Sequence, residues 1–297
     1  MANEKKQSKT LRLLMPQWQG GDSGGPHPGQ VYPLGARLLA WLAPAGDAPL
    51  VEVPVAPYTG ATPAMADGIL WRDEIIRIQR ETRKIIDTHS PDRIITFGGD
   101  CLVSQVPFDW LNERYDGKVG ILWVDTHPDI TTPNNMDRAH AMVLGNLLGG
   151  GEPVMAREVM RHFKPEQVLL VGIDEVLPYE ADTIRQYGLK TLRAEDVAKN
   201  SEAVLKWVKD NRMEHVVIHF DLDVLDPQFF SSQLLKNPNV DKPFDTFAGK
   251  MTIAQVSRLI NDVSAQSDVV GLSFAEYMPW DALNLKHMMA SLPIMKQ

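Results

Sequence analysis

The chain has 297 residues, of which 44% are hydrophobic and 23% charged, and its formal net charge is −8 at pH 7. This composition is typical of a globular protein, and the acidic balance argues against nucleic acids and anionic membranes as main partners, because both are bound through clustered Lys and Arg. A single cysteine excludes an internal disulfide and is typical of a reducing compartment. The N-terminus lacks the apolar core of a signal peptide, and no window reaches the roughly 18 apolar residues of a membrane span. We therefore expect a cytoplasmic protein.

Apolar runs of strand length alternate along the chain with longer segments of helical period. Long loops are expected at residues 20–29 and 231–250, which are rich in Gly, Pro and polar residues. This rhythm predicts one α/β domain over residues 1–297 with a mostly parallel sheet. Strands are predicted at 11–15, 50–55, 93–97, 119–124, 167–171, 216–220 and 269–273, and helices at 69–87, 181–187, 195–212, 253–264 and 280–291.

Three of the predicted strands end in polar motifs. The sequence GGDC occupies residues 98–101, DTHPD occupies 125–129, and DLD occupies 221–223. Ligands bind beyond the carboxyl ends of the strands in open parallel sheets, so these motifs are candidates for one shared site.

The spacing of the acidic residues favours a metal site. Asp125 and His127 are two residues apart, as are Asp221 and Asp223, and such pairs point to the same side of an extended chain. Carboxylates gathered in one pocket repel one another, and divalent cations remove that penalty. Carboxylate oxygens with imidazole suit Mn²⁺ and similar ions. A single Asp-x-Asp after a strand is more often a turn or a helix cap, but two such motifs in one chain favour a shared site.

At these residues the chain resembles the arginase/agmatinase (ureohydrolase) family. Two further segments strengthen the resemblance: RAHAM at 138–142 is similar to the family's catalytic histidine loop, and FAEYMP at 274–279 to its late glutamate segment. The motifs follow one another in the family's order. The resemblance implies a three-layer α/β/α sandwich, a binuclear manganese site, and a homotrimer or homohexamer.

The resemblance also implies a role for each site residue. Asp125 and Asp221 would bridge two ions, His127 and Asp223 would complete the shell of one, and Asp129 and Cys101 the shell of the other. The implied reaction is the hydrolysis of a linear C–N bond in a guanidino or amidino substrate by a water that the ions activate. Three residues would take part directly: Asp129 would bind the attacking water, His140 would carry protons to the leaving amine, and Glu276 would hold the cationic substrate.

Position 101 departs from the family, which has a ligand histidine there. A thiolate prefers softer cations than Mn²⁺, so the sequence predicts unequal occupancy of the two metal positions. Cys101 is alternatively a small buried filler without a ligand role. His219 stands where the family has a serine, and we expect it to hydrogen-bond to a ligating carboxylate rather than to bind a metal.

Leu177 stands where arginases bind the α-amino group of the substrate with an aspartate. Free L-arginine is therefore not the expected substrate, and a guanidino or amidino compound without the α-amino acid end fits better. Two alternatives remain open at this point. One is an arginase-like binding or regulatory protein with an impaired metal site. The other is a zinc deacetylase of a related fold, which would need a paired histidine motif that the sequence lacks.

Overall fold

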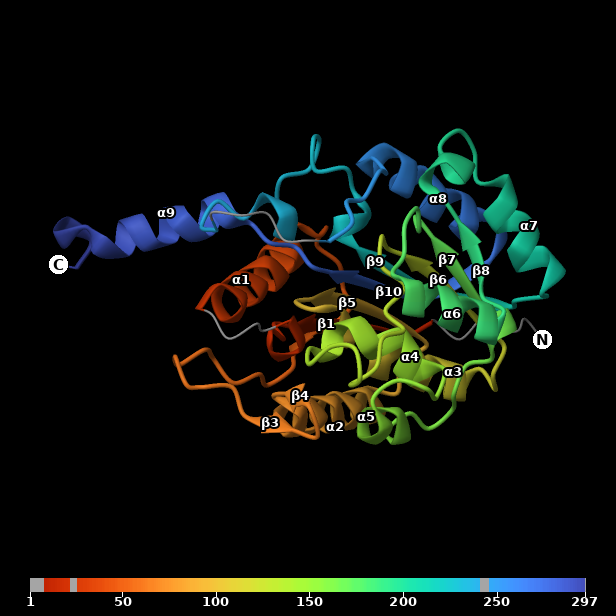
Figure 1. The fold of residues 1–297 in the computed structure, drawn as a ribbon, viewed down its shortest axis with the longest axis horizontal. Coiled ribbons are helices and arrows are strands. Elements are labelled where there is room, and N and C mark those ends of the chain that lie inside the picture. Colours follow the sequence, from red (N-terminus) through yellow and green to blue (C-terminus); the bar gives the residue numbers. More distant parts are fainter. Residues whose placement is uncertain (1–7, 22–25, 241–245, 297) are drawn as a thin grey trace.

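The computed structural model describes residues 8–21, 26–240 and 246–296. An eight-stranded sheet runs through the centre, and each strand is parallel to its neighbours (Figure 1). Its strands are, in spatial order, β2 (Leu50–Glu52), β1 (Thr10–Met15), β5 (Arg93–Gly98), β10 (Asp268–Ala275), β9 (His215–Asp221), β6 (Val119–Val124), β7 (Val168–Val171) and β8 (Lys190–Leu192).

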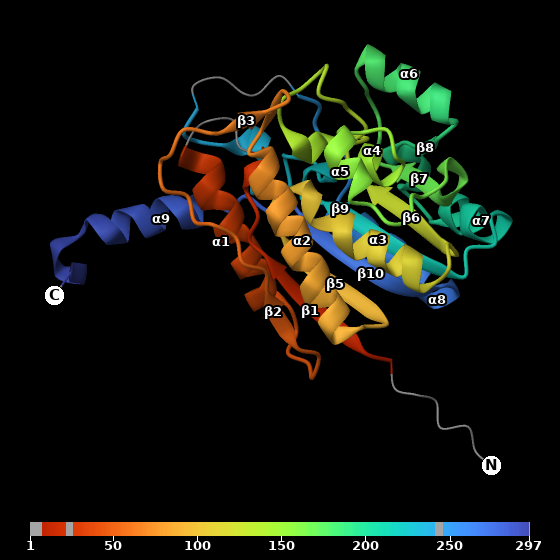
Figure 2. The same ribbon diagram turned by 90° about the horizontal axis from the view of Figure 1, so that it is seen from below.

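Helices cover both faces of this sheet, which makes a three-layer α/β/α sandwich (Figure 2). On one face lie α2 (Arg72–His89), α3 (Gln105–Arg114), α4 (Val143–Leu147) and α5 (Pro153–Arg157). On the other lie α1 (Pro26–Leu42), α7 (Glu202–Asp210) and α8 (Ile253–Gln266). The predicted fold class is confirmed, and the continuously apolar strands are explained by burial on both sides.

Two further helices and one hairpin lie outside these layers. Helix α6 (Pro178–Tyr187) follows β7, and α9 (Trp280–Ser291) extends away from the body of the molecule in both views (Figures 1 and 2). Strands β3 (Met65–Ala66) and β4 (Ile69–Leu70) form a small antiparallel pair. The helix predicted from residue 69 therefore begins only at Arg72.

Other predicted boundaries also need correction. Residues 195–212 are not one helix but a 3₁₀ turn, Ala194–Val197, followed by α7, because the Asn200 side chain accepts a hydrogen bond from the Glu202 backbone and starts a new helix there. The strand predicted at 50–55 ends at Glu52. Of the loop predicted at 20–29, residues 26–29 already belong to α1, and 22–25 lie outside the described residues. Within the loop predicted at 231–250, residues 234–236 form a 3₁₀ turn and 241–245 lie outside the described residues.

Helix α3 was not predicted because it has no exposed face over most of its length. Residues 105–112 are all buried, including the polar Gln105, Asp109 and Asn112, and Pro107 lies within the first turn. Helix α1 was also not predicted, because it is rich in proline and glycine, two residues that disfavour a helix interior.

Gly99 follows β5 at the entrance to the site, and the backbone of Gln17 lies so close to it that there is no space for a side chain. An added Cβ would lie 1.8 Å from the carbonyl oxygen of Gln17, and neither backbone can move easily because Gly99 also donates to Met15. We expect Gly99→Ala to lower the free energy of unfolding by about 1–3 kcal/mol or more through overpacking. Gly46→Ala is the matched control, since nothing lies within 4 Å of its added Cβ. Urea unfolding measures both variants, and equal stabilities would contradict the packing argument.

Candidate metal centre

The predicted site residues come from the carboxyl ends of four strands that are neighbours in the sheet. Cys101 lies just beyond β5, Glu276 directly after β10, Asp221 at the end of β9, and Asp125 directly after β6. Because the spatial order is β5-β10-β9-β6, these four side chains meet at the centre of the sheet's carboxyl edge.

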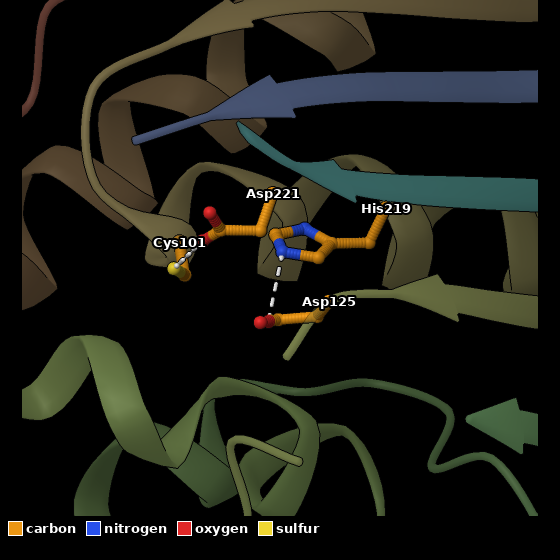
Figure 3. Close-up of side chains that lie close together, drawn as sticks. All are labelled: Cys101, Asp125, His219 and Asp221. Atoms are coloured by element: carbon orange, nitrogen blue, oxygen red, sulfur yellow. Dashed lines mark hydrogen bonds and ion pairs between the residues drawn. The ribbon is translucent and has the colours of Figure 1, made fainter. Parts of the chain in front are cut away.

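Two overlapping groups of potential ligands form there. The donor atoms of Cys101, Asp125, His219 and Asp221 all lie within 4.8 Å of one another, and those of Asp125, His127 and Asp223 form a second such group. Figure 3 shows the first group, with Cys101 beside Asp221 and the His219 ring directed toward Asp125. Asp125 belongs to both groups, as the bridging role expected for it requires. His219 was not expected among the ligands.

Short local hydrogen bonds orient the carboxylates of Asp125 and Asp221. Asp125 accepts from the backbone N–H of His127 at 2.7 Å and from the indole N–H of Trp123 at 3.0 Å. Asp221 accepts from the backbone N–H of Asp223 at 2.7 Å. Each motif is thus folded into a turn in which the first acid fixes the backbone of a second potential ligand.

Asp129 and Glu276 have left-handed backbone conformations, with φ of 48° and 61°. Such values are uncommon for residues other than glycine, and they persist where the surroundings impose them. The backbone N–H of Glu276 donates to the carbonyl of Gly99 at 2.8 Å, which ties this residue to the turn that carries Cys101.

Burial and mutual repulsion dominate the electrostatics. Burial raises the pKa of Asp125, Asp129 and Asp221 well above the ordinary value, and neighbouring carboxylates raise it further. Burial, followed by the charge of Asp221, likewise raises the pKa of the Cys101 thiol.

His127 supplies the compensating positive charge. Its Nδ1 lies 3.0 Å from an Asp223 oxygen, and its Nε2 lies 2.7 Å from the Thr246 hydroxyl. Burial alone would lower the pKa of His127, but the attraction of Asp223 outweighs it and raises the pKa to about 9. Burial would raise the pKa of Asp223, and the same attraction instead lowers it.

The unpaired atoms of this centre fit divalent cations. Among the described residues, Asp129 Oδ2, Asp223 Oδ1 and His219 Nε2 are buried and have no hydrogen-bond partner. Buried polar atoms are normally paired, and carboxylate oxygens with imidazole nitrogen are metal ligands. The group of Asp125, His127 and Asp223 offers only oxygen and nitrogen, a donor set that suits Mn²⁺.

The comparisons with known proteins agree with this geometry. The arginase family model matches residues 70–284, more than half of the chain. The chain belongs to the arginase family. An arginase of Staphylococcus aureus is 24% identical over 169 residues, 54% of this chain, and this match spans about half the length of the curated relative.

Solved structures of the family share the fold. The arginase of Entamoeba histolytica, in complex with L-ornithine, superposes with a TM-score of 0.74 at 18% identity and covers 95% of this chain and 96% of that one. The proclavaminate amidino hydrolase of Streptomyces clavuligerus gives a TM-score of 0.62 at 17% identity over 92% of this chain and 84% of that one. At these identities the likeness supports the arginase fold and not a particular substrate.

A cavity of about 610 Å³ opens onto the metal centre. Cys101, His127, Asp129, Asp221 and Asp223 line it, together with His140 and Glu276. The arginase-family motifs of the sequence therefore meet at one cavity, as expected.

His140 is held in one tautomer. Its Nδ1 lies 2.8 Å from the carbonyl oxygen of Gly20, which can only accept, so Nδ1 carries the proton and Nε2 keeps a free lone pair. Burial lowers the pKa of His140 to about 4, below the working range expected for it. At neutral pH this residue is ready to receive a proton rather than to donate one.

Several residues around the site carry no sequence motif. The Tyr32 hydroxyl donates to Glu276 Oε2 at 2.6 Å, although 244 positions separate the two residues. Glu180, buried at the start of α6, lines the same cavity. Only the three-dimensional fold brings Tyr32, Glu180 and Thr246 to the site, so no local pattern could have identified them.

The raised carboxyl pKa values predict how pH affects the metal-free protein. A buried carboxyl whose pKa is higher in the folded protein than in the unfolded chain stabilises the fold while it is protonated. This contribution is complete below the unfolded pKa of about 4 and is lost as pH rises through the pKa of the folded protein. With a chelator present, we therefore expect the unfolding temperature to fall as pH rises above about 6.5, where His140 and His219, whose pKa values are lowered in the folded protein, no longer oppose the fall. Thermal unfolding followed by circular dichroism measures this dependence.

Two controls show whether the site causes this effect. Excess Mn²⁺ should abolish most of the fall, because cations neutralise the carboxylates. Asp129→Asn should reduce the fall in the chelated protein, since it removes one buried carboxyl. An unfolding temperature that rises with pH equally with and without cations would contradict this account.

Proposed function

We propose that this member of the arginase family is a metal-dependent hydrolase of a linear C–N bond in a guanidine or amidine. The observation that carries the proposal is the position of Glu276, a buried carboxylate that lines the same cavity as the two overlapping ligand groups. A cationic guanidinium bound to Glu276 would place its carbon close to those groups. Mn²⁺ at the oxygen- and nitrogen-rich group is part of the proposal.

The chain's own residues have separate tasks in this reaction. When bound, divalent cations lower the pKa of a water molecule so that it can attack at neutral pH. Asp129 accepts a hydrogen bond from that water and thereby orients it. Glu276, oriented by Tyr32, binds the guanidinium through charge-assisted hydrogen bonds. His140, neutral and with Nε2 unprotonated, takes up a proton and passes it to the leaving amine.

The walls of the cavity support a substrate other than free L-arginine. Leu177, at the N-terminal end of α6, contributes an apolar side chain where an α-amino group would need an acceptor. Met136, Phe247, Met278 and Trp280 add further apolar surface. These side chains favour a methylene chain over a free amino acid.

Arg138 favours a substrate that carries an anionic group at the end opposite its guanidinium. It is the one Lys or Arg among the described residues that line the cavity, and its Nε makes no hydrogen bond, with the nearest carboxylate oxygen, on Asp137, at 3.6 Å. A guanidinium group of the substrate would form charge-assisted hydrogen bonds with Glu276, and a carboxylate group of the same substrate would form them with Arg138. We therefore favour an ω-guanidino acid without an α-amino group.

The second candidate is a binding or regulatory protein that does not turn over substrate. It is favoured by Cys101, whose Sγ lies 3.0 Å from Asp221 Oδ2 and 3.5 Å from Glu276 Oε1, so that it occupies two carboxylates needed for catalysis. In this second candidate function, the sulfur weakens metal binding, and the cavity binds a small molecule without hydrolysing it.

The expected partners and location stay predictions. No helix in the described part of the chain is long and apolar enough to cross a membrane. A cytoplasmic location, no binding to nucleic acids or membranes, and assembly into a homotrimer or homohexamer are expectations from composition and family. Exposed Leu285, Met288 and Met289 on α9 are the apolar surface that another copy would bury in such an assembly.

A substrate screen tests the proposed function. The metal-loaded protein is incubated with L-arginine, agmatine and 4-guanidinobutanoate, and released urea is measured. We expect 4-guanidinobutanoate to have the highest kcat/KM, at least about tenfold above L-arginine, because one unmatched polar group in a pocket costs this much or more. Leu177→Asp should raise turnover of L-arginine, with Leu177→Asn as the uncharged control. L-arginine as the best substrate would refute the assigned pocket.

Substitution of the catalytic residues separates the two candidate functions. His140→Asn and Glu276→Gln should each lower kcat/KM about 100-fold or more, since a positioned proton carrier or an ionic substrate contact is lost. Metal content should be unchanged in His140→Asn. A metal-loaded wild-type protein that binds guanidino compounds in calorimetry but releases no urea from any of them would favour the binding protein.

A further inference from the structure

His219 is a buried side chain that the catalytic account leaves without a role. It lies on β9, two residues before Asp221, and is fully buried. Its Nδ1 lies 2.7 Å from the Ser104 hydroxyl. The expected hydrogen bond to a ligating carboxylate is not formed, because Nε2 lies 3.6 Å from Asp125 Oδ2, beyond hydrogen-bond distance.

The free nitrogen of His219 faces potential ligands. Among the described residues Nε2 has no hydrogen-bond partner, and it lies within 4.8 Å of donor atoms of Cys101, Asp125 and Asp221 (Figure 3). Bonds of about 2.0–2.3 Å to one cation place tetrahedral ligands roughly 3.5 Å apart, so small side-chain movements would close this group around an ion.

Contacts around the group orient the imidazole. The Ser104 hydroxyl can accept a hydrogen bond from Nδ1–H, and in that tautomer Nε2 keeps the lone pair that a metal ligand needs. The ring stacks on Trp123, with 3.7 Å between centroids and 9° between planes, which fixes its orientation. Ser104 ends the same 3₁₀ turn that begins at Cys101, so one turn supplies the sulfur and orients the imidazole.

We propose that Cys101, Asp125, His219 and Asp221 bind one cation in a mixed sulfur, nitrogen and oxygen site that favours a softer ion such as Zn²⁺. The inference rests on the metal centre of the proposed function and identifies its second position. Binding exchanges the thiol proton of Cys101 for the metal, and no oxidation or reduction takes place. The neighbouring group of Asp125, His127 and Asp223 has no sulfur, so the centre holds two chemically different positions that share Asp125.

Cobalt titration of the full-length protein tests the role of the sulfur. Co²⁺ bound to a thiolate gives a near-ultraviolet charge-transfer absorption that oxygen and nitrogen ligands do not give. We expect this absorption in the wild type and in Asp223→Asn, and its loss in Cys101→Ser. The preference for Zn²⁺ over Mn²⁺ should fall at least tenfold in Cys101→His, measured by competition. Saturating cobalt without the sulfur absorption would overturn the proposal.

X-ray absorption at the zinc edge tests the role of His219. With one equivalent of Zn²⁺, the wild type should show one sulfur and one imidazole in the first shell. His219→Asn, which retains a hydrogen-bonding group for Ser104, should lose the imidazole signal, whereas the matched control His127→Asn should retain it. An imidazole signal that persists in His219→Asn and disappears in His127→Asn would refute the role of His219.

These readouts remain decisive if a variant does not fold or if no substrate is found. Circular dichroism establishes the fold of each variant, and the wild-type zinc spectrum alone decides between a shell with sulfur and one without. No urea assay is involved, so a protein that binds Zn²⁺ through sulfur but hydrolyses nothing would retain this inference while the proposed function failed.

Discussion

The repulsion among buried carboxylates at the carboxyl edge of the sheet is the constraint on which the site depends. Strands β9 and β10 come late in the chain but lie between β5 and β6, so acids from distant segments are forced together. Protonation or divalent cations can relieve the repulsion, and only the second leaves the carboxylates charged at neutral pH. His127, with its pKa of about 9, offsets part of the charge and cannot balance the group alone.

The sequence was informative where the pattern was local. The two-residue spacing of Asp125 with His127 and of Asp221 with Asp223 follows from alternation and was sufficient to predict that these side chains gather in one candidate site. Helix α3 was missed because residues 105–112 are buried on all sides, so no exposed charged face marks the helix. The helix predicted at 195–212 was wrong because the Asn200 side chain starts a new helix inside an apolar pattern. The contacts of Tyr32 and Ser104 span more than 100 residues, and no spacing rule reaches that far.

His219 illustrates the limit of reasoning along a single strand. His219 and Asp221 are two residues apart on β9 and lie on one face of the strand, but the sequence predicted no metal contact for His219. The structure adds the neighbouring strand: Trp123 pairs with His219 in register, and Asp125 follows two residues later. Across the sheet, therefore, the His219 ring reaches the space between Asp125 and Asp221, which a measure along one strand does not capture.

A thiolate ligand from Cys101 would have a chemical consequence for the proposed reaction. It would carry a full negative charge and donate more electron density than an imidazole, so it would neutralise more of the charge of its cation. A cation held by sulfur would acidify water less than one held by oxygen and nitrogen alone, so a cation held by Asp125, His127 and Asp223 would be the stronger Lewis acid. Asp125 belongs to both groups of potential ligands and would couple the two positions.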